Sequence, residues 1–155
     1  MGYKIVTKKM LNPQIFLMEI EAPLIAKKAE PGQFIILRID EHGERVPFTI
    51  NDFDREKGTV TVIIQAVGKT TMDLSKMEAG EELLDFAGPL GVPTHLEGLK
   101  KVAVIGGGLG TAIAYPQAKK LHNMGAEVHL ITGFRDKSLI ILEEECKHVS
   151  DKLIV

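Results

Sequence analysis

Short runs of alternating apolar and polar positions fill the first half of the chain. Residues 59–67 begin Thr-Val-Thr-Val, which is typical of a half-buried strand, and Asn12-Pro13 and Pro31-Gly32 are turn signals between such runs. The predicted strands are residues 3–9, 14–21, 33–39, 46–51, 59–67 and 82–86. A short helix is predicted at 71–76, with Thr70 or Thr71 as its N-cap. Strands this short, separated by frequent turns, predict a small antiparallel barrel or sandwich.

The pattern changes in the region between residues 88 and 100. Gly88-Pro89-Leu90-Gly91 and Pro93 interrupt the chain, and we place a domain boundary there. Beyond it, the periodicity predicts a strand at 101–105, a helix at 111–123, a strand at 127–132, a helix at 139–149 and a last apolar segment at 152–155. This alternation of strand and helix is typical of a parallel sheet.

Four glycines lie within five positions at the junction between the strand at 101–105 and the following helix. A strand, a glycine turn and a helix together present backbone N–H groups to a phosphate. The local sequence departs from G-x-G-x-x-G because Thr111 stands where the third glycine would be. The predicted nucleotide-binding residues are Gly106, Gly107, Gly108, Leu109, Gly110, Thr111 and Ala112. A tight turn that binds no ligand is the alternative.

Composition narrows the class of protein. The 155 residues suffice for one domain or two small ones, and 45% of them are hydrophobic, which allows a real core. A net charge of −2 gives no electrostatic reason to expect nucleic acid or an anionic membrane as a partner. We expect no signal peptide, because residues 1–11 contain no apolar core, and no membrane span, because no run approaches ~20 apolar residues.

The chemistry-bearing residues do not suggest a metal centre. The single cysteine, Cys146, excludes an intrachain disulfide and fits a reducing compartment, so a cytoplasmic location is expected. The five histidines show no ligand spacing, and no Cys-x-x-Cys occurs. We therefore predict no metal site in this chain.

Five motifs, in order, resemble those of the ferredoxin–NADP reductase superfamily. Residues 45–50, Arg-Val-Pro-Phe-Thr-Ile, are similar to its first flavin motif, and residues 68–71, Gly-Lys-Thr-Thr, to its second. Residues 88–91 resemble its interdomain turn, and residues 106–112 its nicotinamide-phosphate turn. Residues 133–136 are similar to the segment after the second strand of its nucleotide domain. Together they cover most of the chain and are more specific than any one of them.

The resemblance implies a fold and a function. The fold is a six-stranded antiparallel Greek-key β-barrel that binds FAD, over residues 1–92, followed by a partial Rossmann-like α/β domain for NADP or NAD, over 98–155. The implied activity is that of a flavin-dependent oxidoreductase subunit, which passes electrons between NAD(P)H and an iron–sulfur protein. A large oxidoreductase subunit and ferredoxin are the implied partners.

Within the superfamily, the chain resembles the small flavin subunits. The form Arg-x-Pro-Phe-Thr-Ile favours the α subunit of bacterial ferredoxin–NADP reductase, also called the sulfide dehydrogenase small subunit. The electron-transfer subunit of dihydroorotate dehydrogenase and the hydrogenase γ subunit are alternatives in the same class. A structural or regulatory subunit that binds no flavin is the alternative from another class.

The resemblance assigns roles to the first flavin motif, which contributes Arg45, Val46, Pro47, Phe48 and Thr49 to cofactor binding. The Arg45 guanidinium would meet the FAD pyrophosphate, because its fork of donors suits phosphate oxygens. Phe48 would pack against the flavin, and the Thr49 hydroxyl would contact flavin N5, which makes Thr49 the one candidate for catalysis. The alternatives are a solvated turn arginine, a barrel-core phenylalanine and a threonine on an ordinary strand face.

Two further groups of residues complete the implied sites. Gly68, Lys69, Thr70 and Thr71 would take the second phosphate of FAD, and Ile64, Gln65 and Ala66 would flank the cofactor by backbone contacts. N-capping by threonine is the alternative at residues 68–71. Arg135, beyond the strand at 127–132, would meet a 2′-phosphate, which favours NADP over NAD. A surface arginine without that role is the alternative there.

The proteins that carry these motifs continue to a cysteine-rich segment with a [2Fe–2S] cluster. We therefore expect a truncated chain, with the iron–sulfur centre on a missing segment or on a partner. We also expect poor use of NAD(P)H by this chain alone. An uncovered sheet edge in the partial nucleotide domain predicts self-association or disorder toward the C-terminus.

Overall fold

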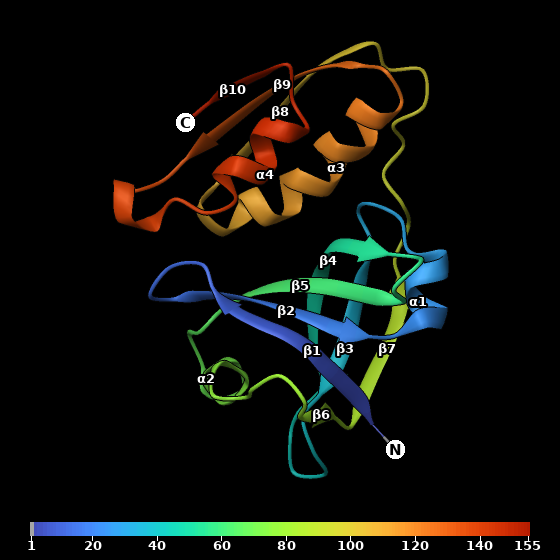
Figure 1. Cartoon of the computed structure of the whole chain (residues 1–155), viewed down its shortest axis with the longest axis vertical. Coiled ribbons are helices and arrows are strands. Elements are labelled where there is room, and N and C mark those ends of the chain that lie inside the picture. The colour runs from blue at the N-terminus through green and yellow to red at the C-terminus, as the bar shows by residue number, and fades with distance from the viewer. Residues whose placement is uncertain (1) are drawn as a thin grey trace. The chain divides into compact units, whose positions relative to one another are not determined.

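The computed structural model describes residues 2–155, which form two compact units (Figure 1). The first unit extends to Pro93, and the second is Thr94–Val155. Among residues 2–155, no helix combines the length and the apolar character needed to span a bilayer.

The first unit is an antiparallel sheet that curls into a barrel (Figure 1). Its seven strands are β1 (Tyr3–Met10), β2 (Ile15–Glu21), β3 (Phe34–Arg38), β4 (Val46–Asp54), β5 (Thr59–Gln65), β6 (Glu82–Leu83) and β7 (Asp85–Leu90). Their spatial order is β6-β1-β2-β5-β4-β3-β7. Strands β3, β4 and β5 are consecutive neighbours, and β2 lies beside β5, which is the Greek-key arrangement. The antiparallel Greek-key barrel predicted from the sequence is therefore confirmed.

The number of strands differs from the prediction because the predicted sixth strand, residues 82–86, is two strands. Strand β6 pairs with β1, whereas β7 pairs with β3, at the other end of the sheet. The chain changes partner at Leu84, whose N–H donates to the carbonyl oxygens of Arg38 and Ile39, both at 3.0 Å. One short segment thus joins the two ends of the sheet and closes the barrel. The periodicity of the sequence does not show this change of partner.

The barrel core is built from the inward-facing positions of these strands. On β2, Phe16, Met18 and Ile20 are fully buried, while Leu17 and Glu19 between them are half-buried. The same alternation places Ile35 and Leu37 of β3 in the core. The remaining large core side chains with under 2% exposure in this unit are Ile5, Ile50, Ile64, Leu74 and Leu83.

Two helices lie in the connections of the barrel. Helix α1 (Pro23–Lys28) was not predicted, because Ala22-Pro23 reads as a stop signal; Pro23 instead occupies the start of the helix, where its missing N–H has no cost. The Arg55 guanidinium donates to the carbonyl oxygen of Ala29 at 3.0 Å, which satisfies the end of α1. Helix α2 (Lys69–Ser75) begins two residues before its predicted start, with Gly68 rather than a threonine as its N-cap.

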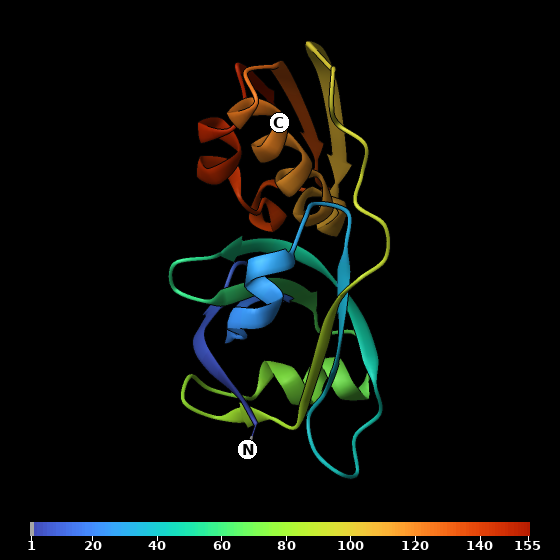
Figure 2. The same cartoon turned by 90° about the vertical axis from the view of Figure 1, so that its right-hand side faces the viewer.

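The second unit is a three-stranded parallel sheet with helices on one face (Figures 1 and 2). Its strands are β8 (Lys101–Gly107), β9 (Glu127–Gly133) and β10 (Lys152–Ile154), in the order β10-β9-β8. Helix α3 (Thr111–Asn123) packs on β8 and β9, and α4 (Glu143–His148) packs on β10. Two 3-10 turns, η1 (Gly108–Gly110) and η2 (Lys137–Leu139), complete the unit. The predicted α/β domain is confirmed, and α3 has the predicted bounds.

The helix predicted over 139–149 is shorter than expected. Residues 137–139 form η2, and α4 begins only at Glu143. Between them, Ile141 and Leu142 are 3% and 8% exposed, and Leu142 has a left-handed φ of 58°. Leu142, with this left-handed backbone, is the N-cap of α4, and Glu143–Glu145 form its first turn, where carboxylates are favourable.

The core of the barrel gives a direct test of the inward and outward alternation on β2. Met18→Ala should lower the free energy of unfolding by about 2–5 kcal/mol, because Met18 is fully buried and its truncation leaves a cavity. Leu17→Ala, on the adjacent half-buried position, is the matched control and should cost clearly less. Urea denaturation of both variants, followed by circular dichroism, measures the difference. Equal losses would contradict the assigned faces of β2.

Candidate functional site

The first flavin motif places Thr49 and Pro47 on the outer face of the barrel. Thr49 pairs with Phe34, and Pro47 with Ile36. Residues directly opposite one another in an antiparallel pair share a face, and the alternate residues of β3, Ile35 and Leu37, are fully buried. The Thr49 hydroxyl makes no hydrogen bond to any other residue in the described range 2–155. It is therefore available to a ligand on this face.

Phe48 has the opposite orientation. It pairs with the fully buried Ile35 and packs, half-buried, against the barrel core. The structure thus places the Phe48 ring among core side chains, as the core alternative would have it, and leaves Phe34 and Ile36 as the apolar residues beside Thr49.

Strand β4 leaves β5 near this motif. The β4–β5 ladder runs from Asp54 opposite Thr59 only as far as Ile50 opposite Val62, with a register shift between Ile50 and Asp52. Residues 46–49 pair with β3 instead. The strand thus changes partner in its middle, and its first half separates from the end of β5, which leads into the second flavin motif.

The end of β5 is hydrogen-bonded to Gln14, the residue before β2. The Ile64 side chain lies in the core, 1% exposed. The Ala66 N–H donates to the carbonyl oxygen of Gln14 at 2.9 Å, and the Gln65 amide donates to the Gln14 side chain at 3.3 Å. The Ala66 N–H is therefore already bonded within the barrel.

One hydrogen bond joins the loop before β4 to the start of α2. The Thr70 hydroxyl donates to the Glu44 carboxylate at 2.7 Å, across 26 positions of sequence. Glu44 directly precedes Arg45, so the bond holds the loop before β4 against the start of α2. The structure thus places Glu44, the residue before the first predicted phosphate-binding group, against Thr70 of the second group.

Thr71 has a different role from Thr70. Its hydroxyl accepts hydrogen bonds from the N–H groups of Val67 and Gly68, both at 2.9 Å, and contacts the Gly68 carbonyl oxygen at 3.1 Å. Thr71 is the third residue of α2, so its hydroxyl caps the N–H of the N-cap residue Gly68, which is close to the alternative of a capping threonine without placing a threonine at the N-cap itself. No heavy atom lies within 4 Å of a Cβ placed on Gly68, so the space beside that residue is open.

The charged side chains of these motifs are paired. The Arg45 guanidinium donates to Asp85 at 3.2 Å, and Arg38 donates to the same carboxylate oxygen at 2.9 Å. Lys69 pairs with Asp73 at 3.0 Å, and this bond is the main cause that raises the pKa of Lys69. Arg45 remains 61% exposed. Asp85 and Glu44 were not singled out in the sequence; Asp85 is 40 positions from Arg45, and only the fold brings them together.

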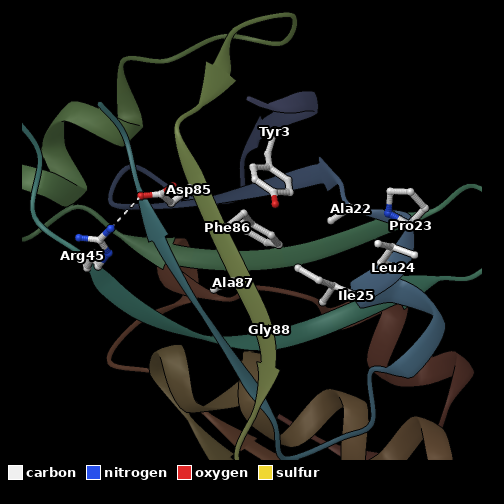
Figure 3. A pocket seen from close by; sticks show the side chains of 10 residues that line it. All are labelled: Tyr3, Ala22, Pro23, Leu24, Ile25, Arg45, Asp85, Phe86, Ala87 and Gly88. Carbon is white, nitrogen blue, oxygen red and sulfur yellow. Dashed lines mark hydrogen bonds and ion pairs between the residues drawn. The ribbon is translucent and has the colours of Figure 1, made fainter. Parts of the chain in front are cut away.

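A cavity of about 630 Å³ lies beside β7 (Figure 3). Its walls come from β1, α1 and β7, and Arg45 and Asp85 lie at one end. Its lining residues are Tyr3, Ala22, Pro23, Leu24, Ile25, Arg45, Asp85, Phe86, Ala87 and Gly88. Of the residues predicted for FAD, only Arg45 lines this cavity, so it is not the space in front of Thr49.

The glycine turn of the second unit begins later than predicted. Gly106 and Gly107 are the last residues of β8, and the turn proper is η1. Gly108 has a φ of +54°, a conformation that favours glycine. The Thr111 hydroxyl, at the start of α3, is fully buried and has no hydrogen-bond partner among residues 2–155. The turn therefore combines an open backbone with a buried polar group that lacks a partner.

Gly106 and the end of β9 fix the position of this turn. A Cβ on Gly106 would lie 2.9 Å from the Thr111 Cα and 3.0 Å from the Ala114 Cβ, so only glycine lets α3 pack this closely on β8. Gly107 pairs with Gly133, which places the turn beside the carboxyl end of β9. Binding crevices of open α/β sheets lie at this edge. Ala112 is buried, and Leu109 is half-buried.

Arg135 lies just beyond β9 with an exposed side chain. Its neighbour Asp136 accepts hydrogen bonds from the Ser138 hydroxyl and N–H, which lower the pKa of Asp136, with a smaller contribution from the charge of Arg135. Asp136 therefore caps η2, and the Arg135 guanidinium stays exposed at the predicted nucleotide edge.

Cys146 is not a candidate nucleophile. Its side chain is 1% exposed on α4, and burial, with a smaller contribution from Glu145, raises the pKa of the thiol to about 11. A protonated, buried thiol is a structural group.

Comparison with known proteins identifies the fold. The chain is 49% identical to an uncharacterized protein of the adh 3′ region of Clostridium beijerinckii, over 99% of the chain and 54% of that protein. It is 40% identical to a homologue of the dihydroorotate dehydrogenase B (NAD(+)) electron transfer subunit from Thermotoga maritima, over 98% of the chain and 54% of the relative. No protein-family model matches the sequence.

Two solved structures share the fold of this chain. The NADH-dependent reduced ferredoxin-NADP oxidoreductase, determined in work on flavin-based electron bifurcation, superposes with a TM-score of 0.94 at 37% identity, over 99% of this chain and 55% of that one. The chain has the fold of the ferredoxin–NADP reductase superfamily. A ferredoxin reductase of carbazole 1,9a-dioxygenase, at 21% identity and a TM-score of 0.83, shows the same fold. The chain spans about half the length of the curated relatives that it matches.

The close packing at the nucleotide turn can be tested with adjacent glycines. Gly106→Ala should lower the free energy of unfolding by about 1–3 kcal/mol, because its Cβ would overlap α3. Gly107→Ala is the matched control: its Cβ would meet nothing closer than 4.0 Å, and its φ of −118° suits alanine. Urea denaturation, with hydrogen exchange of the α3 amides as a local readout, compares the two. Similar stability of both variants would contradict this account of Gly106.

Proposed function

We propose that the first unit binds FAD along the outer face of β4. Arg45 and Thr70 would hold the pyrophosphate, with the backbone at Gly68 beside them, and Thr49 would contact the flavin. The hydrogen bond between Thr70 and Glu44 supports this proposal, because Glu44 directly precedes Arg45 and Thr70 belongs to the second predicted phosphate-binding group.

The residues present fit such a ligand. The Arg45 guanidinium is largely exposed. Among residues 2–155 it bonds to Asp85 through one nitrogen, so its other N–H donors are available to phosphate oxygens, which a guanidinium suits. The Thr49 hydroxyl is free of partners in the described chain, and the space beside Gly68 is open. Phe34, Ile36 and Pro47 supply an apolar surface on the face to which Thr49 belongs. A flavin ring needs such a surface together with a small number of placed polar groups.

The chemistry would come mainly from the cofactor, and the chain's residues would position it. When bound, FAD would take up hydride and release electrons one at a time. Thr49 would hold the flavin by a hydrogen bond and tune it, and Arg45 would neutralise pyrophosphate charge. Neither residue needs to act as a general acid or base, and we propose none.

We propose a nicotinamide nucleotide site at the turn between β8 and α3. The open backbone of Gly108–Gly110, the unpartnered Thr111 hydroxyl and the N-terminus of the 13-residue α3 support an anion there. The exposed Arg135 at the end of β9 favours NADP, since a guanidinium can meet a 2′-phosphate. NAD stays the alternative.

For the whole protein we propose a cytoplasmic flavin-dependent electron-transfer subunit that works with a larger oxidoreductase subunit and an iron–sulfur acceptor such as ferredoxin. The 37% identical oxidoreductase supports a ferredoxin-linked role. The second candidate is the electron-transfer subunit of dihydroorotate dehydrogenase, which the Thermotoga maritima relative favours. A [2Fe–2S] cluster is typically held by four cysteines and this chain has one, so the centre would belong to another segment or subunit.

The absorption spectrum of the purified chain, alone and after titration with FAD, tests the central claim. A flavin spectrum that stays with the protein through gel filtration supports it, whereas a chain that remains colourless with excess FAD overturns it. Co-purification from cells then distinguishes the two candidate partners by the large subunit recovered.

Arg45 should matter for FAD affinity. Arg45→Ala is expected to weaken FAD binding by about 1.5–3 kcal/mol, the range for a hydrogen bond to a charged group. Lys57→Ala, which removes one positive charge from the exposed β4–β5 turn, is the control and should leave the affinity nearly unchanged. Fluorescence titration gives both dissociation constants, and equal affinities in wild type and Arg45→Ala would refute the assignment.

Thr49 should matter for the flavin's redox properties. Thr49→Val keeps the shape of the side chain but removes the hydroxyl, so FAD should still bind while its midpoint potential shifts by about 10–30 mV, the equivalent of one neutral hydrogen bond. Thr7→Val, the same change on β1, is the control. Spectroelectrochemical titration measures the potential, and an unchanged value in Thr49→Val would remove Thr49 from the site.

A further inference from the structure

The side chains proposed to meet the FAD phosphates already have acidic partners within this chain. Each partner lies within hydrogen-bond distance of its donor. The pairs are Arg45 with Asp85 at 3.2 Å, Lys69 with Asp73 at 3.0 Å and Thr70 with Glu44 at 2.7 Å. A phosphate that enters this site must therefore compete with carboxylates that occupy the same donors.

The three carboxylates are not equivalent. Asp85 and Asp73 are partners of cations, so their charges are compensated in place, and Asp85 also accepts from Arg38. Glu44 accepts from a neutral hydroxyl and has no Lys or Arg within ion-pair distance in the range 2–155. Its charge is felt by Lys69, whose pKa it raises, but only after Asp73 and Asp40 among the charges. Glu44 therefore presents an uncompensated carboxylate at the hydroxyl that a phosphate would use.

We propose that Glu44 is an affinity-setting residue of this site, which holds the Thr70 hydroxyl in the ligand-free chain and opposes binding of the pyrophosphate. The inference rests on the proposed FAD site and adds a residue that works against the ligand. Binding of the pyrophosphate breaks the bond between Thr70 and Glu44 and turns the carboxylate away. The site consequently binds phosphate groups more weakly than Arg45, Lys69 and Thr70 would without Glu44.

The cost of this exchange has two parts. The Thr70 hydroxyl gives up a charge-assisted hydrogen bond to the Glu44 carboxylate, and this loss offsets the bond that it forms to the phosphate; a neutral acceptor at position 44 would offset less of it. The displaced carboxylate then remains close to the phosphate, and like charges at the surface repel over distances up to the Debye length. Glu44 is exposed, in a loop before β4, so its side chain can move without disturbing the core.

The test compares Glu44→Gln with wild type. Glutamine keeps the size and an acceptor oxygen but removes the charge, so the FAD dissociation constant should fall about threefold to tenfold at low ionic strength. The gain should shrink at high salt, because the repulsion is screened. Riboflavin, which has the same ring system and no phosphate, should bind no more strongly to the variant. Glu41→Gln, the same charge change in the same loop, is the matched control and should leave FAD affinity within about twofold.

A double-mutant cycle isolates the hydroxyl. In a Thr70→Val background the hydrogen bond to Glu44 is absent, so the gain from Glu44→Gln should be clearly smaller. Thermal unfolding without ligand verifies that each variant is folded, and Glu44→Ala repeats the charge removal with a smaller side chain.

Three results would overturn the inference: an unchanged FAD dissociation constant in Glu44→Gln, an equal gain for riboflavin, or a full gain in the Thr70→Val background. Failure of wild type to bind FAD at all would be a different outcome. It would refute the proposed function itself, whereas the three results above leave FAD binding intact.

Discussion

One segment, residues 82–90, closes the barrel by pairing with both ends of the antiparallel sheet. Strand β6 completes the edge at β1, and β7 completes the edge at β3, with the change of partner at Leu84. Without this closure the sheet would present two open edges, each with unpaired backbone groups. The same closure brings Asp85 beside Arg38 and Arg45, so the barrel's topology also determines where the predicted flavin arginine is held.

The candidate flavin face depends on a second change of partner, in the middle of β4. The strand pairs with β5 through Ile50 and with β3 before it, so its first half leaves the β5 side of the sheet. This geometry places the Thr49 hydroxyl outward, next to Phe34, with no hydrogen-bond partner among residues 2–155. It also leaves room for Glu44 to reach Thr70 at the start of α2. Within the described residues, the Thr49 hydroxyl thus lacks a partner, whereas Arg45, only four positions earlier, already bonds to a carboxylate.

Two glycines determine the conformation of the turn between β8 and α3, one through lack of space and the other through its backbone dihedral. Gly106 has no room for a Cβ because α3 lies against β8, and Gly108 adopts a positive φ. Close packing of the helix on the strand is what directs the start of α3, with its buried Thr111, toward the carboxyl edge of the sheet. The contact between Gly106 and α3 thus contributes both to the packing of this unit and to the position of the candidate phosphate site.

The sequence by itself predicted the order of most elements and the residues of both candidate sites. Alternation on the strands, the glycine turn before α3 and the resemblance of Arg45–Ile50 and Gly68–Thr71 to flavin motifs are local signals, written in neighbouring residues. Only the tertiary structure decided that residues 82–90 form two strands, that Phe48 packs on the core, and that Asp85 and Glu44 hold the predicted donors. These facts depend on contacts between segments far apart in the chain, and on which face of a strand closure turns inward. The pattern of neighbouring residues does not specify these long-range contacts or the inward face.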